Sequence, residues 1–169
     1  MSDGVRVGIM MGSASDLPAM SGASAVLDEL GIAHEMRIMS AHRTPEEADS
    51  YAASAPDRGI QVLICGAGMA AHLAGCVAGR TLLPVIGVPL GASFGGMDAL
   101  LATVQMPPGV PVATVAVGKA GAKNAAWLAA RIIALNDDAL RARLAAAVQR
   151  MADKVRSADA ALQRGELTP

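Results

Sequence analysis

The sequence predicts an α/β protein built on a doubly wound, parallel sheet of five strands. Five short apolar segments alternate along the chain with segments whose apolar residues recur at helical spacing. Such alternation is typical of βαβ units, in which helices join parallel strands. The 169 residues are 53 % hydrophobic, which is enough for a packed core in one domain. We therefore expect a flavodoxin-like strand order in a three-layer sandwich.

Each strand is predicted from a short apolar run, and each helix from its apolar periodicity and end signals. We expect the strands at residues 5–11, 34–39, 60–65, 85–88 and 111–117. We expect the helices at residues 20–30, 45–55, 98–104 and 122–135. Gly31 ends the first helix and Pro56 follows the second. The chain has no internal repeat or linker that would divide this arrangement.

A long amphipathic helix is predicted for residues 137–164, and it does not fit a compact monomer. Its apolar stripe consists of Leu140, Leu144, Val148, Met151 and Val155. At 1.5 Å per residue the helix is roughly 40 Å long, longer than a small domain is wide. Because such a stripe needs a neighbour, we interpret the helix as an arm over a partner subunit. A helix folded back on its own domain is the alternative.

Composition and charge argue against several classes of function. The net charge is −1 and the only aromatics are Tyr51, Phe94 and Trp127, so nucleic-acid binding is not expected. Without a signal-peptide pattern or an apolar run of roughly 18 residues, we expect a cytoplasmic protein that does not enter membranes. Cys65 and Cys76 fit no disulfide or metal-ligand spacing and are expected in the core. Three dispersed histidines predict no metal site.

Residues 40–45 carry the densest chemical signal in the chain. Ser40, His42 and Arg43 bring a hydroxyl, an imidazole and a permanent cation together between a predicted strand and a predicted helix. Thr44 is expected to cap that helix and Glu47 to complete a capping box. Ligands of open α/β sheets bind at such strand ends. Since histidine exchanges protons near neutrality and arginine suits phosphate or carboxylate, we expect an anionic small-molecule site with a proton-transfer histidine.

A Gly/Ser loop at residues 12–16 follows the first predicted strand. Gly12 permits a tight turn, and Ser15 or Asp16 is expected to cap the next helix. Backbone N–H groups and the helix dipole favour an anion at this point, so the loop resembles a phosphate cradle. It has neither the lysine of a P-loop nor the three glycines of a dinucleotide fingerprint. A plain capped turn is the alternative.

Small residues dominate positions 66–75, after the third predicted strand, and let the backbone approach a ligand closely. Within this stretch His72 either lines a site or starts a helix, whereas His34 is expected to be an ordinary strand residue. The three loops should share one rim of the sheet. Together they indicate a proton-transfer enzyme for a small phosphorylated metabolite, without metal or nucleotide cofactor. A dinucleotide oxidoreductase and a flavodoxin-type carrier are disfavoured by the missing fingerprint and the scarcity of aromatics.

Seven motifs in order resemble one family, the N5-carboxyaminoimidazole ribonucleotide mutases of de novo purine biosynthesis. This is the bacterial-type class I phosphoribosylaminoimidazole carboxylase catalytic subunit family. The motifs are MGSASD at 11–16, SAHRTP at 40–45, GAGMAAHL at 66–73, PVIGVP at 84–89, DALLATVQMP at 98–107, GVPV at 109–112 and AGAKNA at 120–125. The likeness covers residues 5–135.

The resemblance implies an isomerase that moves a carboxylate from the exocyclic N5 of carboxyaminoimidazole ribonucleotide to ring C4, through carbon dioxide held in the site. It implies His42 as the general acid and base, Ser13 and Arg43 at the phosphate, and Asp16 at the ribose hydroxyls. The implied substrate-binding residues are Ser13, Ser15, Asp16, Ser40, Ala41, Arg43, Gly68, Ala70, His72 and Leu73. It also implies a homo-octamer and no cofactor. Residues 1–136 would be the catalytic domain, and residues 137–169 its helical extension, packed on another subunit.

The third motif departs from the family pattern at three positions. Met69 stands where the family usually has Gly, and Ala74 and Cys76 stand where it has Pro and Met. The related carboxylase class, which uses free carbon dioxide, typically has Lys in place of Arg43 and lacks the histidine at His72, so both residues favour the mutase. A carboxylase and a non-catalytic nucleotide-phosphate binding subunit are the alternatives. Gly66, Ala67, Gly68, Ala70 and Ala71 are expected to form the carbon dioxide pocket.

Overall fold

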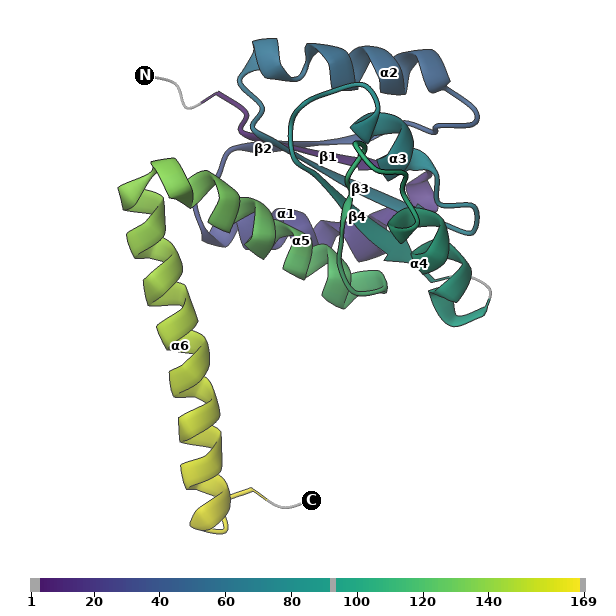
Figure 1. The fold of residues 1–169 in the computed structure, drawn as a ribbon. Coiled ribbons are helices and arrows are strands. Elements are labelled where there is room, and N and C mark those ends of the chain that lie inside the picture. Colours follow the sequence, from purple (N-terminus) through teal and green to yellow (C-terminus); the bar gives the residue numbers. More distant parts are fainter. Residues whose placement is uncertain (1–3, 92–93, 168–169) are drawn as a thin grey trace.

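The computed structural model describes residues 4–91 and 94–167, and within them the sheet has the predicted topology. The parallel strands are β1 (Val7–Met11), β2 (His34–Ile38), β3 (Val62–Gly68), β4 (Val85–Leu90) and β5 (Ala113–Thr114). They lie in the order β2-β1-β3-β4-β5, the flavodoxin-like order (Figure 1). Because the order reverses between β1 and β3, the carboxyl ends of these two strands flank the crevice where ligands of such folds bind.

All five strands differ from their predicted bounds, and the two largest differences follow from strand pairing. β5 is much shorter than the predicted 111–117, since Pro111 has no N–H to donate and the strand lies at the sheet edge, paired only with β4. β3 continues past the predicted end at residue 65, because Ala67 and Gly68 pair with Pro89 and Leu90 of β4. This extension carries small residues up to the rim of the sheet.

Helices cover both faces of the sheet and complete three layers (Figure 1). They are α1 (Leu17–Glu29), α2 (Pro45–Ser54), α3 (Leu73–Ala78), α4 (Met97–Val104), α5 (Gly118–Ile133) and α6 (Asp138–Gln163). Helices α1 and α5 pack together on one face, and α2 and α3 cover the other. Along β1, Ile9 and Met11 therefore enter the first core, while Met10 enters the second.

Close packing beneath the rim depends on Gly66 of β3. A Cβ atom at this position would lie 2.4 Å from the Sδ atom of Met20 on α1. Met20 is fully buried, so the absence of a side chain at Gly66 lets α1 pack directly against the carboxyl end of β3. Gly66 is thus a packing residue of the core, and the small residues that reach the cavity come later in the chain.

Helix α3 was expected only as one of the two alternatives for His72, and it corrects the prediction for one cysteine. Leu73, Ala74 and Val77 of α3 are buried against the sheet. Cys76 lies outside this stripe and is exposed, whereas Cys65 of β3 is buried as predicted. Burial raises the pKa of the Cys65 thiol well above its usual value. The two cysteines therefore occupy different environments, and only Cys65 belongs to the core.

Helix α6 extends away from the α/β body instead of folding back over it (Figure 1). At its base, the Asp137 carboxylate accepts hydrogen bonds from the Leu140 N–H (2.9 Å) and from Arg6 Nη1 (2.7 Å). Nearby, Arg143 Nε donates to the Leu30 carbonyl (2.9 Å). The apolar stripe then leaves the core, because Leu140 is fully buried while Val155 is 70 % exposed. No helix of the described segments is both long and apolar enough to cross a membrane.

Candidate active site

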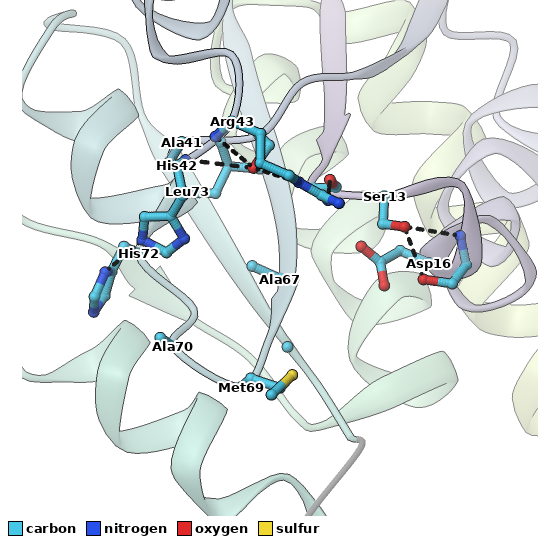
Figure 2. A pocket seen from close by; sticks show the side chains of 14 residues that line it. Ser13, Asp16, Ala41, His42, Arg43, Ala67, Met69, Ala70, His72 and Leu73 are labelled. Atoms are coloured by element: carbon cyan, nitrogen blue, oxygen red, sulfur yellow. Dashed lines mark hydrogen bonds between the residues drawn. The ribbon is translucent and has the colours of Figure 1, made fainter.

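The loops after β1, β2 and β3 enclose a cavity of about 530 Å³ (Figure 2). Its walls are formed by Gly12, Ser13, Ser15, Asp16, Ser40, Ala41, His42, Arg43, Ala67, Gly68, Met69, Ala70, His72 and Leu73. Every residue predicted as catalytic or substrate-binding is in this set, although the positions span some 60 residues of chain. The structure therefore brings the candidate residues together, while the role of each toward a substrate stays a prediction.

Asp16 stands at the N-cap of α1, as expected, but its side chain makes no cap hydrogen bond. The short helical turn before α1 is capped by Ser13, whose Oγ accepts from the Ser15 N–H (3.3 Å) and from the Ser15 hydroxyl (3.0 Å). Burial raises the pKa of Asp16, while hydrogen bonds to the backbone of Ser13 and Gly12 and the charge of Arg43 act in the opposite direction. The short helical turn at Ala14–Asp16 thus exposes hydroxyls and a carboxylate along one side of the cavity.

The loop after β2 is organised by the hydroxyl of Ser40. Ser40 Oγ accepts from the backbone N–H groups of His42 (3.3 Å) and Arg43 (3.2 Å) and from Arg43 Nε (3.4 Å). Arg43 Nη2 also donates to the Gly12 carbonyl at 2.6 Å, which ties this loop to the loop after β1. Because its guanidinium is held at two points, Arg43 is oriented before any ligand arrives.

Thr44 does not form the predicted capping box with Glu47. Its side chain makes no cap hydrogen bond to α2. Instead, Thr44 Oγ1 accepts from the Ser40 N–H (2.9 Å) and donates to the Ser40 carbonyl (3.3 Å). Thr44, which the sequence pattern predicts as a helix cap, therefore closes the loop that presents His42 and Arg43.

His42 and His72 meet across the cavity wall. His42 Nε2 lies 2.8 Å from His72 Nδ1, and the two rings stand nearly perpendicular with centroids 4.9 Å apart. One ring donates and the other accepts in this hydrogen bond, which occupies Nε2 of His42 and leaves its Nδ1 outside the pair. His72 also precedes the first residue of α3, so it lines the site and begins a helix, the two roles that the sequence left open.

The loop after β3 supplies a wall of small side chains. Of the five small residues expected at a carbon dioxide pocket, Ala67, Gly68 and Ala70 line the cavity, whereas Gly66 lies against Met20 and Ala71 is not among the lining residues. At Gly68 a Cβ atom would lie 3.1 Å from the Leu90 carbonyl oxygen. A larger residue would therefore push this strand end away from β4.

Gly12 and Met69 also line the cavity but were not predicted as catalytic or substrate-binding residues, and Ala67 was expected only at the carbon dioxide pocket. Gly12 and Met69 each adjoin a predicted site residue in the sequence, and this adjacency could have indicated them. His34 lies elsewhere, between the Ser24 hydroxyl (2.7 Å) and the Ile32 carbonyl (3.0 Å), in the structural position that was predicted. Among residues 4–91 and 94–167, no group of His, Cys, Asp and Glu side chains is placed to hold a metal ion.

Known proteins match this chain over most of its length. A sequence model of the family described as AIR carboxylase matches residues 6–154. N5-carboxyaminoimidazole ribonucleotide mutase of Mycobacterium tuberculosis is 54 % identical over 166 residues, which are 96 % of this chain and 94 % of that protein. The mutase of Escherichia coli is 51 % identical over 140 residues, covering 82 % and 83 %. The crystal structure of Treponema denticola PurE has a TM-score of 0.83 at 33 % identity, covering 92 % of this chain and 97 % of that one.

Proposed function

Since the chain belongs to the AIR carboxylase family, we propose that it is an N5-carboxyaminoimidazole ribonucleotide mutase, an isomerase of de novo purine biosynthesis. The observation that carries this function is the meeting of a proton-exchanging group and an oriented cation in one cavity. His42 and Arg43 are adjacent in a loop fixed by Ser40, and Arg43 reaches the loop after β1. The family model spans both loops, and the Mycobacterium tuberculosis mutase matches 96 % of the chain.

The substrate would lie with its phosphate at Ser13 and Arg43 and its ribose at Asp16. The guanidinium of Arg43 supplies charge-assisted hydrogen bonds, which are stronger than neutral ones. The Asp16 carboxylate accepts hydrogen bonds from hydroxyl groups when it is ionised. This orientation directs the heterocycle toward His42 and the small residues of the loop after β3.

The reaction needs one group that gives a proton and later takes one back. Protonated His42 gives its proton to N5 of the carbamate, the N5–carboxyl bond breaks, and carbon dioxide leaves while the bonding pair stays on nitrogen. The enamine-like C4 then attacks carbon dioxide and forms the new carbon–carbon bond. Neutral His42 takes the proton from C4, which restores the aromatic ring and returns His42 to its starting state. Atoms and charge balance without a cofactor.

Carbon dioxide has no charge by which it could be held between the two steps. We therefore propose that the close wall of Ala67, Gly68 and Ala70 retains it beside the ring and excludes water. These residues line the cavity and carry no large side chain. The free energy of retention would then come from shape and exclusion, not from a specific bond.

We also propose that the protein is a cytoplasmic homo-octamer that binds neither nucleic acid nor membranes. Residues 1–136 would form the catalytic domain, and residues 137–169 an extension packed on another subunit. The exposed apolar side chains of Val148, Met151 and Val155 on α6 support this arrangement, because such a stripe is unusual on a monomer.

A second candidate is suggested by the family description itself, a carboxylase that consumes free carbon dioxide. The test is to supply substrate labelled with ¹³C in the N5-carboxyl group together with unlabelled bicarbonate. The mutase is expected to form product that keeps the ¹³C label in the carboxyl group attached to C4. Product formed only from aminoimidazole ribonucleotide and bicarbonate would indicate a carboxylase, and no turnover at all would indicate a binding subunit.

A further inference from the structure

Hydrogen bonds, and not core packing, hold His42 and Arg43 in place. Both residues are exposed, so contact with the core does little to restrict their side chains. The loop that carries them is anchored at its two ends. The Met39 N–H donates to a carbonyl of β1 (2.8 Å), and the Thr44 carbonyl accepts from an N–H of α2 (3.2 Å). Whatever fixes the backbone between these two anchors therefore fixes both functional groups.

Three hydrogen bonds between Ser40 and Thr44 close this loop into a ring. The Thr44 N–H donates to the Ser40 carbonyl (2.9 Å), and the Thr44 hydroxyl donates to the same oxygen (3.3 Å). In the opposite direction, the Ser40 N–H donates to Thr44 Oγ1 (2.9 Å). Because two of the three bonds use the hydroxyl, its removal would leave the ring closed by a single bond.

Thr44 makes these bonds in place of a helix cap. It stands at the N-cap of α2, where a threonine hydroxyl usually accepts from an N–H of the first helical turn. The Thr44 side chain makes no such bond, although Pro45 and the acidic residues Glu46 and Glu47 begin a regular first turn. The hydroxyl is therefore directed at the loop before the helix and not at the helix itself.

Ser40 transmits the closure of the ring to both functional groups. Its Oγ accepts from the N–H groups of His42 and Arg43 and from Arg43 Nε, while its backbone is bonded to Thr44. Figure 2 shows the Arg43 side chain leaving the loop toward Ser13 and the His42 side chain leaving it on the other side. A shift of Ser40 would therefore displace the proton-exchanging group and the cation together.

We propose that the hydroxyl of Thr44 positions both His42 and Arg43, so that proton transfer and substrate binding depend on one residue outside the cavity wall. This inference rests on the proposed mutase function and adds a positioning residue to it. Thr44 is not among the residues that line the cavity, so its effect has to pass through the loop. Loss of its hydroxyl should then change turnover and KM at the same time.

Two substitutions separate the hydroxyl of Thr44 from its shape. Thr44→Val keeps the branched side chain without the hydroxyl, and Thr44→Ser keeps the hydroxyl without the methyl group. With N5-carboxyaminoimidazole ribonucleotide as substrate, turnover by Thr44→Val is expected to fall about tenfold, since a misplacement of about 1 Å can cost roughly 10²-fold. KM is expected to rise about threefold, as for loss of a neutral hydrogen bond. Thr44→Ser is expected to restore both constants to near the wild-type values.

Thr81→Val is the matched control for a loss of stability. The Thr81 hydroxyl also accepts from a backbone N–H, that of Leu83 (3.2 Å), in a turn away from the cavity. Thermal unfolding is expected to show a lower midpoint for both valine variants, whereas only Thr44→Val should change the kinetic constants. Thr44→Ala, which also lacks the hydroxyl, gives the same test if Thr44→Val does not fold.

Double variants test whether Thr44 acts through the two groups. Adding Thr44→Val to His42→Asn should cause no further loss of turnover, and adding it to Arg43→Lys should cause no further rise in KM, because coupled positions are not additive. Additive losses in either background would overturn the inference, as would wild-type constants for Thr44→Val. Wild-type protein that forms no C4-carboxylated product would remove the proposed function, and this inference with it.

Discussion

The rim of the cavity and the outer half of α6 are both exposed, yet they present different chemistry to the solvent. At the rim, His42 and Arg43 are polar and already oriented by hydrogen bonds to neighbouring loops. On α6, Val148 and Val155 are apolar, and the polar residues beside them are already paired, Gln149 with Asp153 in the helix and Arg150 with Glu29 of α1. The rim is prepared for a small polar ligand, whereas the stripe on α6 can be satisfied only by another apolar surface.

Removing α6 should have the largest effect, because it affects both the domain and its assembly. A chain that ends at Leu135 lacks Leu140 and Leu144, which are buried in the first core, and each lost leucine costs about 2–5 kcal/mol. We expect a smaller oligomer or an insoluble chain, as measured by light scattering. Val155→Asp leaves the core intact and should still reduce the oligomer, with Lys154→Ser as the exposed control. Full-length protein that is monomeric at micromolar concentration would contradict the role of the arm.

At the rim, the largest expected loss comes from His42→Asn. Asparagine is of similar size and keeps hydrogen-bonding capacity but cannot exchange a proton at neutral pH. We expect turnover to fall by about 10²-fold or more, the range for loss of a positioned acid–base group. Substrate binding, followed by calorimetry, should change little. Near-normal turnover in this variant would remove His42 from proton transfer.

Arg43→Lys should weaken binding while sparing the fold. Lysine keeps the charge but loses the fork that contacts Gly12 and Ser40 at the same time. We expect KM to rise about tenfold or more, as for loss of a charge-assisted hydrogen bond. Arg37→Lys, on an exposed position of β2 outside the active-site cavity, is the matched control. Equal kinetic constants for Arg43→Lys and wild type would place Arg43 outside the binding site.

The smallest effect is expected for His72→Asn. Asn can still hydrogen-bond to His42 Nε2 and still fits the first turn of α3. We expect turnover to fall by less than about tenfold, below the usual contribution of an acid–base group. The ratio of turnover between the His42 and His72 variants is the decisive measurement. A collapse in the His72 variant alone would reverse the assignment of the proton carrier.

Strand order and the shared rim could be predicted because each depends on a local pattern and a general rule of topology. Apolar runs such as Val7–Met11 predicted the strands. Because the strands are parallel, the polar loops that follow them were predicted to lie together at one edge of the sheet. The Thr44 pattern was also read correctly as a loop-to-helix junction. Its hydroxyl bonds were not predictable, since a cap to α2 and a bond to Ser40 use the same residue.

Contacts between segments that are distant along the chain could not be predicted from the sequence. The approach of His42 to His72 depends on how two loops 30 residues apart are set by the sheet. Cys76 was misplaced because α3 consists mainly of small residues, whose periodicity is too weak to indicate a buried face. Met69 was noted only as a departure from a family pattern, and its unusual φ angle is visible only in the structure.

The anchored base of α6 makes the helix a lever. Contacts of Asp137 with Arg6, of Arg143 with Leu30 and of Arg150 with Glu29 hold the first half of the helix, and the residues from Arg150 to Gln163 carry the other end about 20 Å further. A tilt at the base is therefore magnified into a large displacement at the tip. In the assembly proposed above, the direction of this helix would depend on a few polar contacts between Asp137 and Arg150, away from the apolar surface that a partner would touch. Sequence changes at these contacts would move the tip of the helix without changing the apolar side chains that it presents.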